Sequence, residues 1–248
     1  MEARTMNKVT TRLRHEVKMR NVSVSRIEIL SPNIRAITFK GESLSDFYSP
    51  SFEDHVKLIV ETRDGAAVRR DYTPRKYRAD TQELTLEIGI HDHGLGSDWA
   101  RHARLGDAAV IAGPKGSLMI PKDYDWHLLV GDLTALPAIH RRLEELPSES
   151  KVIVRLLISE AADQRVIELG PSMELQWFTK PIELIRSVKG LKVPSGIGFA
   201  WCAGEAALMS EIKTILVDEK ALAPDLMKIG VYWKSGDPGY HTNLVRPD

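Results

Sequence analysis

The stretch that decides the fold begins at Arg70–Arg75, RDYTPR, and ends at Gly113–Leu118, GPKGSL. Within it, Leu84–His91 (LTLEIGIH) alternates apolar and polar positions and is rich in β-branched residues, which predicts a strand. Gly94–Ala100 (GLGSDWA) follows and predicts a loop that runs into a short helix. We interpret the whole stretch as the wall of a small β-barrel with a helix start beside it.

The rest of the first half also predicts short strands separated by turns. Its expected strands, with the one above, are residues 22–30, 34–39, 55–60, 84–91 and 108–112. Five or six short strands with one intervening helix are typical of a small antiparallel barrel, and we predict six strands.

The second half has a different pattern. A buried-type strand at residues 127–131 precedes helical spacing at 134–143, and strands and helices continue to alternate. This alternation predicts an open parallel sheet with helices on both faces. We therefore predict an antiparallel β-barrel domain at residues 1–121 and an α/β domain with a C-terminal tail at residues 122–248. Because ligands bind at the carboxyl ends of parallel strands, the site is expected between the domains.

The composition argues against several classes of protein. The 248 residues include 34 Lys plus Arg and 34 Asp plus Glu, and this balance gives no general electrostatic reason for a nucleic-acid or membrane partner. Cys202 is the single cysteine, which excludes an internal disulfide and an iron–sulfur cluster held by this chain's own thiolates. No apolar run is long enough to span a bilayer, and the N-terminus lacks a signal-peptide core. We expect a cytoplasmic monomer.

Three neighbouring side chains indicate a flat, anionic ligand. In an extended segment alternate residues share a face, so Arg70 and Tyr72 are expected to point the same way. A guanidinium binds a phosphate through two donors, a tyrosine ring can lie along a flat ring system, and Thr73 can hydrogen-bond the polar edge of that ring. FAD combines these features. The alternative is a solvated turn with an ordinary strand tyrosine.

The segment after the predicted strand offers a place for the diphosphate of such a ligand. Gly96 supplies a flexible backbone, and Ser97 or Asp98 is the expected N-cap of the helix. Amides at a helix start bind phosphate, so these residues and Trp99 are assigned to the cofactor. The alternative for Trp99 is that it fills the core beneath the barrel.

The histidines of this loop are interpreted in the same way. His91 is expected to contact the phosphate or ribose of the cofactor. His91 and His93 alternate, as metal ligands do in some sites, but a third and a fourth ligand are missing nearby. We therefore predict no metal site.

Two strand-to-helix turns of the second half are candidates for binding NAD(P)H. The first contains Asp132 and Thr134 but lacks the spaced glycines of the Rossmann fingerprint. The second contains Gly204 and Glu205, and a glycine there permits a close approach of the nicotinamide ribose. The alternatives are an ordinary capped helix at the first turn, and a strand end with a helix cap at the second.

Taken in order, eight motifs closely resemble the siderophore-interacting protein family. They are HVKL at 55–58, RDYTPR at 70–75, IHDHGLGSDWA at 90–100, GD at 106–107, GPKGS at 113–117, GDLTALPAI at 131–139, AGEA at 203–206 and VYWKSG at 231–236. The resemblance spans almost the whole chain. It implies a ferredoxin-reductase-like flavoprotein, with an FAD barrel followed by an NAD(P)H domain, that reduces ferric siderophores in the cytoplasm.

The resemblance also implies roles for individual residues. The flavin contacts fall on Arg70, Tyr72, Thr73, His91, Gly96, Ser97, Asp98 and Trp99, and the nicotinamide loops on Asp132, Thr134, Gly204 and Glu205. A basic triad for the anionic siderophore, found in some members, falls on Lys57, Lys115 and Lys234, where the alternative is solvated surface lysines. Lysine stands at 115 where arginine is common, which keeps the charge but loses the planar fork. Leu133 replaces the usual acidic residue.

The implied reaction is hydride transfer from NAD(P)H to FAD, followed by single-electron reduction of the Fe(III) siderophore to release Fe(II). No protein acid or base is obligatory. NADPH is expected as the donor because Ser159, Arg165, Arg75 or Lys76 could receive its 2′-phosphate, while Glu160 keeps NADH open. The alternatives are a flavoprotein that exchanges electrons with a small redox protein such as ferredoxin, and a siderophore-binding flavoprotein without catalysis.

Overall fold

Alternating buried side chains build the sheet of the first domain in this computed structural model, which describes residues 10–62, 64–91, 94–237 and 240–245. In β7 (Glu83–Gly89), for example, Leu84, Leu86 and Ile88 are fully buried. The other strands are β2 (Met19–Ser31), β3 (Ile34–Lys40), β4 (Val56–Glu61), β5 (Ala67–Tyr72), β6 (Pro74–Arg78) and β8 (Ala108–Ala112). All pairings are antiparallel, in the order β5-β4-β8-β2-β3-β7-β6.

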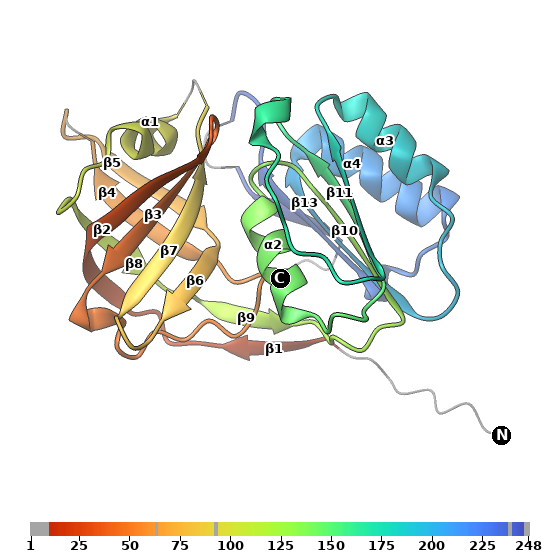
Figure 1. Cartoon of the computed structure of the whole chain (residues 1–248), viewed down its shortest axis with the longest axis horizontal. Helices are drawn as coiled ribbons and strands as arrows, with labels where there is room; N and C mark the ends of the chain where they lie inside the picture. Colours follow the sequence, from red (N-terminus) through yellow and green to blue (C-terminus); the bar gives the residue numbers. More distant parts are fainter. Residues whose placement is uncertain (1–9, 63, 92–93, 238–239, 246–248) are drawn as a thin grey trace.

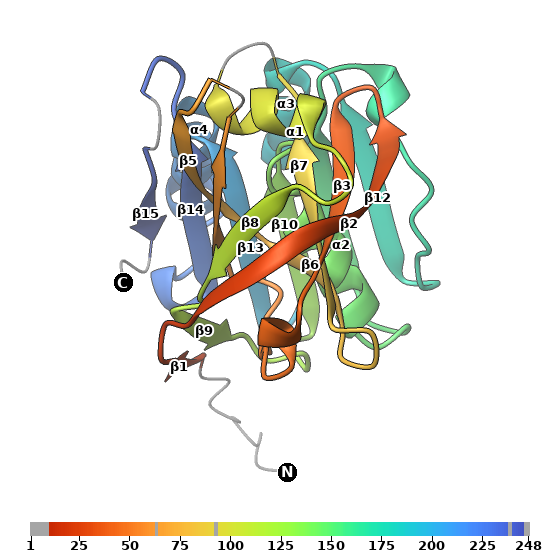
Figure 2. The ribbon, with the colours of Figure 1, turned by 90° about the vertical axis from the view of Figure 1, so that its left-hand side faces the viewer.

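This sheet has seven strands, whereas the sequence predicted six. The difference lies in Ala67–Arg78, a charged segment that forms the two edge strands β5 and β6. Charged residues are common on edge strands, and they obscure the apolar alternation that predicts a strand. Because only Thr73 separates β5 from β6, the opposite edges of the sheet must meet there, and the sheet curls (Figure 2).

The second domain is a six-stranded sheet in the order β12-β11-β10-β13-β14-β15. Its strands are β10 (Trp126–Gly131), β11 (Val152–Leu157), β12 (Met173–Phe178), β13 (Gly198–Glu205), β14 (Met227–Trp233) and β15 (Thr242–Val245). All are parallel except β15, which pairs antiparallel with β14, so the sheet is mixed. The predicted α/β architecture is confirmed, with an added antiparallel edge.

Helices cover both faces of this second sheet. The α-helices of the chain are α1 (Leu95–His102), α2 (Leu136–Glu145), α3 (Pro181–Gly190) and α4 (Ala206–Thr214). Short helical turns are η1 (Glu42–Leu44), η2 (Ala161–Asp163), η3 (Ile215–Glu219) and η4 (Pro224–Leu226). Figure 1 shows α2 between the two sheets and α3 and α4 on the far face, while α1 lies against the barrel.

A small two-stranded sheet lies below both domains. It pairs β1 (Thr11–Arg14) antiparallel with β9 (Gly116–Met119), and residues 120–125 then lead into β10 (Figure 1). The division into residues 1–121 and 122–248 remains a prediction. In the part of the chain that the structure describes, no helix is long and apolar enough to cross a membrane.

Candidate cofactor and substrate site

The first turn of α1 lies directly against Arg70 and Tyr72. A Cβ added at Gly96 would be 2.8 Å from Tyr72 Oη and 3.3 Å from Arg70 Cγ, so this approach requires glycine. The two side chains therefore lie together beside α1, as their alternation in β5 predicted. The structure thus joins two motifs that are 24 residues apart or more in the sequence into one cluster, the Arg70–Tyr72–Gly96 cluster.

The Arg70–Tyr72–Gly96 cluster combines a cationic group with a neutral phenol. Arg70 Nη1 donates to the carbonyl of Arg69 at 2.9 Å. Burial raises the pKa of Tyr72 to about 12, so its hydroxyl keeps its proton at neutral pH. Thr73 is buried between the two edge strands.

The start of α1 differs from the expected one. Its N-cap is Gly94, at φ 113°, and no side chain caps it, so Ser97 or Asp98 as N-cap was wrong. Gly94 adopts a left-handed φ that is unfavourable for other residues, and the helix can therefore begin three residues before Asp98. The first bond along the helix runs from Asp98 N to Gly94 O at 3.0 Å. The amides of residues 95–97 precede it and point out of the helix start, where phosphate binds in other proteins.

Ser97 and Trp99 have structural contacts of their own. The Ser97 hydroxyl accepts from the amide of His91 at 2.8 Å and donates to its carbonyl at 2.7 Å, which ties the loop to the helix. The Trp99 ring is 6% exposed and stacks on Phe39 with centroids 6.3 Å apart. The alternative reading of Trp99, a residue that fills the barrel core, therefore describes its ring. Asp98 is exposed and pairs with His102 at 3.3 Å.

His91 itself is exposed beside this loop. Asp92 and His93 lie outside the described residues. Among the residues that the structure describes, no group of three His, Cys, Asp or Glu is arranged to hold a metal ion.

Asp132 joins three strand ends at the carboxyl edge of the second sheet. Its Oδ1 accepts from Thr134 N at 2.8 Å and from Thr134 Oγ1 at 2.5 Å. Its Oδ2 accepts from Glu205 N at 2.8 Å and from Trp233 Nε1 at 2.9 Å. Burial raises the pKa of Asp132, and these hydrogen bonds oppose the rise. The two predicted nicotinamide loops therefore meet on one carboxylate.

Gly204 makes this meeting possible. It has φ 154°, and a Cβ there would be 2.6 Å from Asp132 Oδ2. Glu205 follows it and caps α4, because its Oε2 accepts from Ala207 N at 2.6 Å and Leu208 N at 3.2 Å. The alternative reading of this turn, a strand end with a helix cap, thus describes Glu205.

Trp233 is a contact that the sequence reasoning missed. It belongs to the VYWKSG motif, but no role followed from its position, since its partner Asp132 is 101 residues away. The loop between β10 and α2 also faces the barrel: Leu133 Cδ2 would be 4.0 Å from a Cβ at Gly89, the last residue of β7. The Asp132 turn therefore lies at the junction of the two domains.

The three predicted substrate lysines come from two places. Lys57, in β4, pairs with Ala112 at the end of β8, and Lys115 follows three residues later, so both lie near the same end of adjacent strands. Lys57 Nζ is 2.8 Å from Asp71 Oδ1, and Lys115 is exposed. Lys234 comes from the other domain, directly after β14, with Nζ 5.2 Å from the centroid of the Tyr240 ring.

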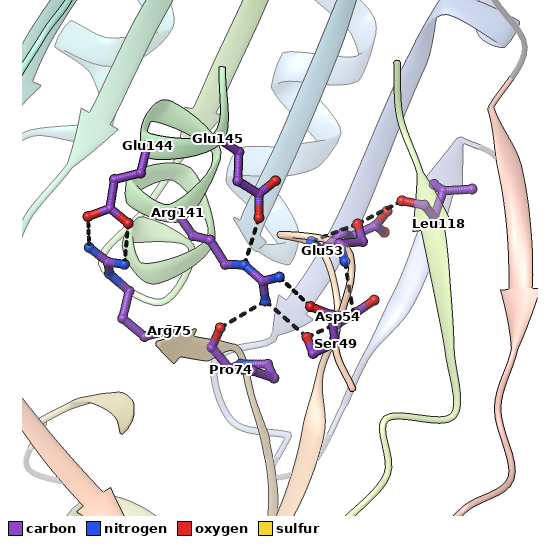
Figure 3. Close-up of polar contacts among 10 residues, drawn as sticks. Ser49, Glu53, Asp54, Pro74, Arg75, Leu118, Arg141, Glu144 and Glu145 are labelled. Carbon is purple, nitrogen blue, oxygen red and sulfur yellow. Dashed lines mark hydrogen bonds and ion pairs between the residues drawn. The ribbon is translucent and has the colours of Figure 1, made fainter. Parts of the chain in front are cut away.

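Two of the expected 2′-phosphate ligands are already paired at the domain interface. Arg75 binds both carboxylate oxygens of Glu144 at 2.7 Å (Figure 3). It also lies 3.2 Å from Glu87 Oε1. Arg165 Nη2 is 2.6 Å from Glu87 Oε2. Both guanidinium groups therefore hold the domains together, and the expectation that they receive a phosphate is not supported. Ser159 and Lys76 are exposed.

Arg141 makes another contact of the interface. As Figure 3 shows, it extends from α2 to the barrel loop, where Nη2 donates to Ser49 O at 2.6 Å and Nη1 to Pro74 O at 3.0 Å. Glu145 holds the same guanidinium from the helix side at 2.8 Å. These contacts hold α2 against Ser49 and Pro74. Pro74 is the first residue of β6 and lies two residues after Tyr72 of the Arg70–Tyr72–Gly96 cluster.

The stability of this interface is expected to fall as the pH is lowered from about 6.5 to about 4. Burial, then Arg75 and Arg165, lower the pKa of His140 to about 4, whereas a histidine in the unfolded chain has its ordinary value of 6.5. Between these pH values His140 is protonated in the unfolded chain and neutral in the folded protein, so lowering the pH favours unfolding. After allowance for partial exposure we expect a loss of about 2 kcal/mol.

Urea unfolding at pH 7 and pH 4.5 measures this loss. In His140→Phe the difference between the two pH values should shrink by about that amount. An equal difference in wild type and variant would contradict the assignment to His140.

Comparison with known proteins decides the family. The profile of the siderophore-interacting protein family matches residues 124–236, and that of the siderophore-interacting FAD-binding domain matches residues 23–68 and 60–118. A ferric vibriobactin reductase of Vibrio cholerae is 30% identical over 245 residues, covering 87% of this chain and 90% of its own. The chain belongs to the siderophore-interacting protein family. The resemblance seen in its eight motifs is thereby confirmed.

Two further proteins are similar to this chain along nearly their whole length. An NADPH-dependent ferric-chelate reductase of Escherichia coli is 29% identical over 244 residues, covering 90% of this chain and 95% of its own. The crystal structure of a siderophore utilization protein from T. fusca superposes with a TM-score of 0.87 at 27% identity, covering 93% of this chain and 98% of that one. The Arg70–Tyr72–Gly96 cluster lies within the stretch that matches the family's FAD-binding domain.

Proposed function

We propose that this protein is a cytoplasmic, monomeric reductase that uses NADPH and FAD to reduce ferric siderophores and so release Fe(II). The observation that carries the proposal is the approach of Gly96 to Arg70 and Tyr72, which brings a guanidinium, a phenol and a helix start together. Membership of the siderophore-interacting protein family supports it, as does the similarity to reductases of ferric chelates.

The described residues fit FAD as the bound group. A single Cβ at Gly96 would fill the space beside the backbone, so this position has to be glycine. A diphosphate needs the same open backbone to approach the amides of the helix start. We assign Arg70 and the amides of residues 95–97 to the diphosphate, and Tyr72 and Thr73 to the ring. When bound, FAD would supply the step from two-electron hydride transfer to single-electron transfer.

The carboxyl edge of the second sheet is assigned to the nicotinamide. Thr134, Gly204 and the neighbouring backbone would bind NADPH against the junction with the barrel, which Leu133 and Gly89 mark. The chain has to orient the donor and exclude water there. No side chain has to hold or move a proton for this reaction.

The substrate is assigned to the lysines. A ferric siderophore binds Fe(III) through hard oxygen ligands and is often anionic, and reduction weakens the match between metal and ligands. Lys57, Lys115 and Lys234 would attract such an anion locally although the net charge is zero. The pairing of Lys57 with Asp71 cancels the net charge at that position, so Lys115 and Lys234 should contribute more to the attraction.

Stopped-flow absorbance tests this function directly. We expect NADPH to bleach the oxidised flavin anaerobically, and a ferric tris-catecholate to restore its colour. Lys115→Ala should raise the apparent Kd for the chelate by roughly 3- to 10-fold at low salt, and Lys57→Ala by less. Lys192→Ala is the control, because this exposed lysine lies in the loop between α3 and β13. That loop is at the amino end of β13, whereas the Asp132 turn is at the carboxyl ends of the strands.

Three results would contradict parts of the proposal. Unchanged chelate affinity in both lysine variants would refute the basic site. Bleaching by reduced ferredoxin and not by NADPH would replace the donor. A protein that does not bind FAD would refute the reductase as a whole.

A further inference from the structure

We propose that Asp132 is a positioning residue that holds the donor loop and the Lys234 turn in register. Through Thr134 and Glu205 it fixes the loops assigned to NADPH, and through Trp233 it fixes the start of the turn that carries Lys234. The proposal rests on the proposed function for the roles of these loops. The observations behind it are the hydrogen bonds that Asp132 accepts.

The Asp132 carboxylate cannot serve as a direct ligand of the cofactor. Two oxygens offer about four lone-pair positions, and four donors already occupy them: Thr134 N, Thr134 Oγ1, Glu205 N and Trp233 Nε1. The residue is also only 6% exposed. Four donors match an ionised carboxylate, which is acceptor-only. Asp132 must therefore act through the groups that it holds.

Those groups belong to three different strands. Thr134 follows β10, Glu205 is the last residue of β13, and Trp233 is the last residue of β14. The backbone of β13 reaches Asp132 only because Gly204 has no side chain. One carboxylate therefore sets the relative position of three strand ends that are neighbours in the order β10-β13-β14.

The bond to Asp132 is what fixes the indole of Trp233. Trp233 is 41% exposed, so burial alone does not hold its ring. Asp132 Oδ2 accepts its Nε1–H at 2.9 Å, a charge-assisted bond, which is stronger than a neutral one.

The turn after Trp233 depends on the same anchor. Lys234 is the next residue, and the turn closes with a bond from Asp237 N to Lys234 O at 3.1 Å. Glu205 Oε1 also accepts from Ser235 N of this turn at 3.5 Å, a long bond. Because Glu205 is itself bound to Asp132 through its amide, this contact and the Trp233 anchor lead back to one carboxylate.

Three variants separate the effect of Asp132 on the loops assigned to NADPH from its effect on the turn that carries Lys234. Trp233→Phe removes only the indole donor, and we expect it to raise the KM for a ferric tris-catecholate about fivefold to tenfold while the rate of flavin reduction by NADPH is unchanged. Thr134→Ala removes the hydroxyl donor on the NADPH side, while the amides of Thr134 and Glu205 remain, and we expect slower flavin reduction with the chelate KM unchanged. Asp132→Asn should impair both half-reactions, because an amide cannot accept from all four donors.

Trp126→Phe is the matched control. Trp126 is a buried tryptophan whose Nε1 has no hydrogen-bond partner among the described residues, so the same exchange removes no bond. It should leave both half-reactions at the wild-type values. If Trp126→Phe and Trp233→Phe change the chelate KM equally, the effect is general loosening and the proposal is overturned.

A second readout needs neither cofactor nor substrate. In protein labelled with ¹⁵N-tryptophan, the Trp233 indole N–H, assigned by its loss in Trp233→Phe, should exchange slowly despite its exposure, and Asp132→Asn should speed that exchange at least tenfold. Exchange that is equally fast in wild type and Asp132→Asn would refute the bond. If wild type fails to accept electrons from NADPH, the proposed function fails instead, and the exchange measurement still decides whether Asp132 holds Trp233.

Discussion

Replacing Gly96 with alanine is expected to weaken FAD binding by roughly 10- to 100-fold, from an overpacking cost of about 1–3 kcal/mol. The added Cβ would be 2.8 Å from Tyr72 Oη and 3.3 Å from Arg70 Cγ, so α1 or both side chains must move. These are the groups assigned to the ring and the diphosphate. Alanine is a better helix former than glycine, so the helix itself does not suffer. Fluorescence titration of the apoprotein with FAD measures the change.

Two further variants identify the cause of this loss. Gly190→Ala is the control, because a Cβ at the end of α3 meets no atom within 4 Å, and it should bind FAD as wild type does. Adding Tyr72→Phe to Gly96→Ala deletes the hydroxyl that clashes, and should recover part of the affinity. Wild-type affinity in Gly96→Ala would show that FAD does not bind at the Arg70–Tyr72–Gly96 cluster.

The second large effect is expected from Glu87→Gln, which should lower the free energy of unfolding by about 3 kcal/mol. Glu87 is 8% exposed and lies between Arg75, at 3.2 Å, and Arg165, at 2.6 Å. Without its charge, two largely buried guanidinium groups face each other, and among the described residues Glu144 is the carboxylate that still pairs with Arg75. For a chain of this length the loss corresponds to a fall in Tm of roughly 6–12 °C, which calorimetry measures.

An exposed ion pair provides the comparison. Glu219 pairs with Lys189 at 2.9 Å on the surface, where the side chains are 38% and 61% exposed. Exposed pairs contribute little, so Glu219→Gln should change the free energy of unfolding by less than about 0.5 kcal/mol. Equal effects of the two substitutions would mean that the Arg75–Glu87–Arg165 contacts do not stabilise the domain interface.

The layout of the two sheets was largely predictable because burial leaves a period in the sequence. Strands β3, β7 and β10 carry runs or alternations of buried residues, and each was expected close to its observed position. The edge strands β5 and β6 were not assigned as strands, since charged residues interrupt the apolar alternation in both and no such period appears. The antiparallel pairing of β15 was missed for a related reason: four residues are too short for a pattern.

The sequence predicted which residues belong to the site better than it predicted what those residues contact. Motif resemblance selected Arg70, Tyr72, Gly96, Asp132 and Gly204, and the structure brings the first three together and joins the last two. It also gives Glu205 a capping bond and places the Trp99 ring in the core. A motif records which residue types occur, and it cannot tell a side chain that binds a ligand from one that holds the backbone.

The sequence by itself determined the family, the order of barrel and α/β domain, and the glycines and charges available for a cofactor, because these depend on local pattern and residue type. Only the tertiary structure decided how those groups are used. It paired Arg165 with Glu87 and Arg75 with Glu144 across the interface, so their expected role as phosphate ligands is not supported, and it placed Trp233 on Asp132. These contacts join residues 69 to 101 positions apart in sequence through chain packing, and local sequence has no period or spacing that reports them.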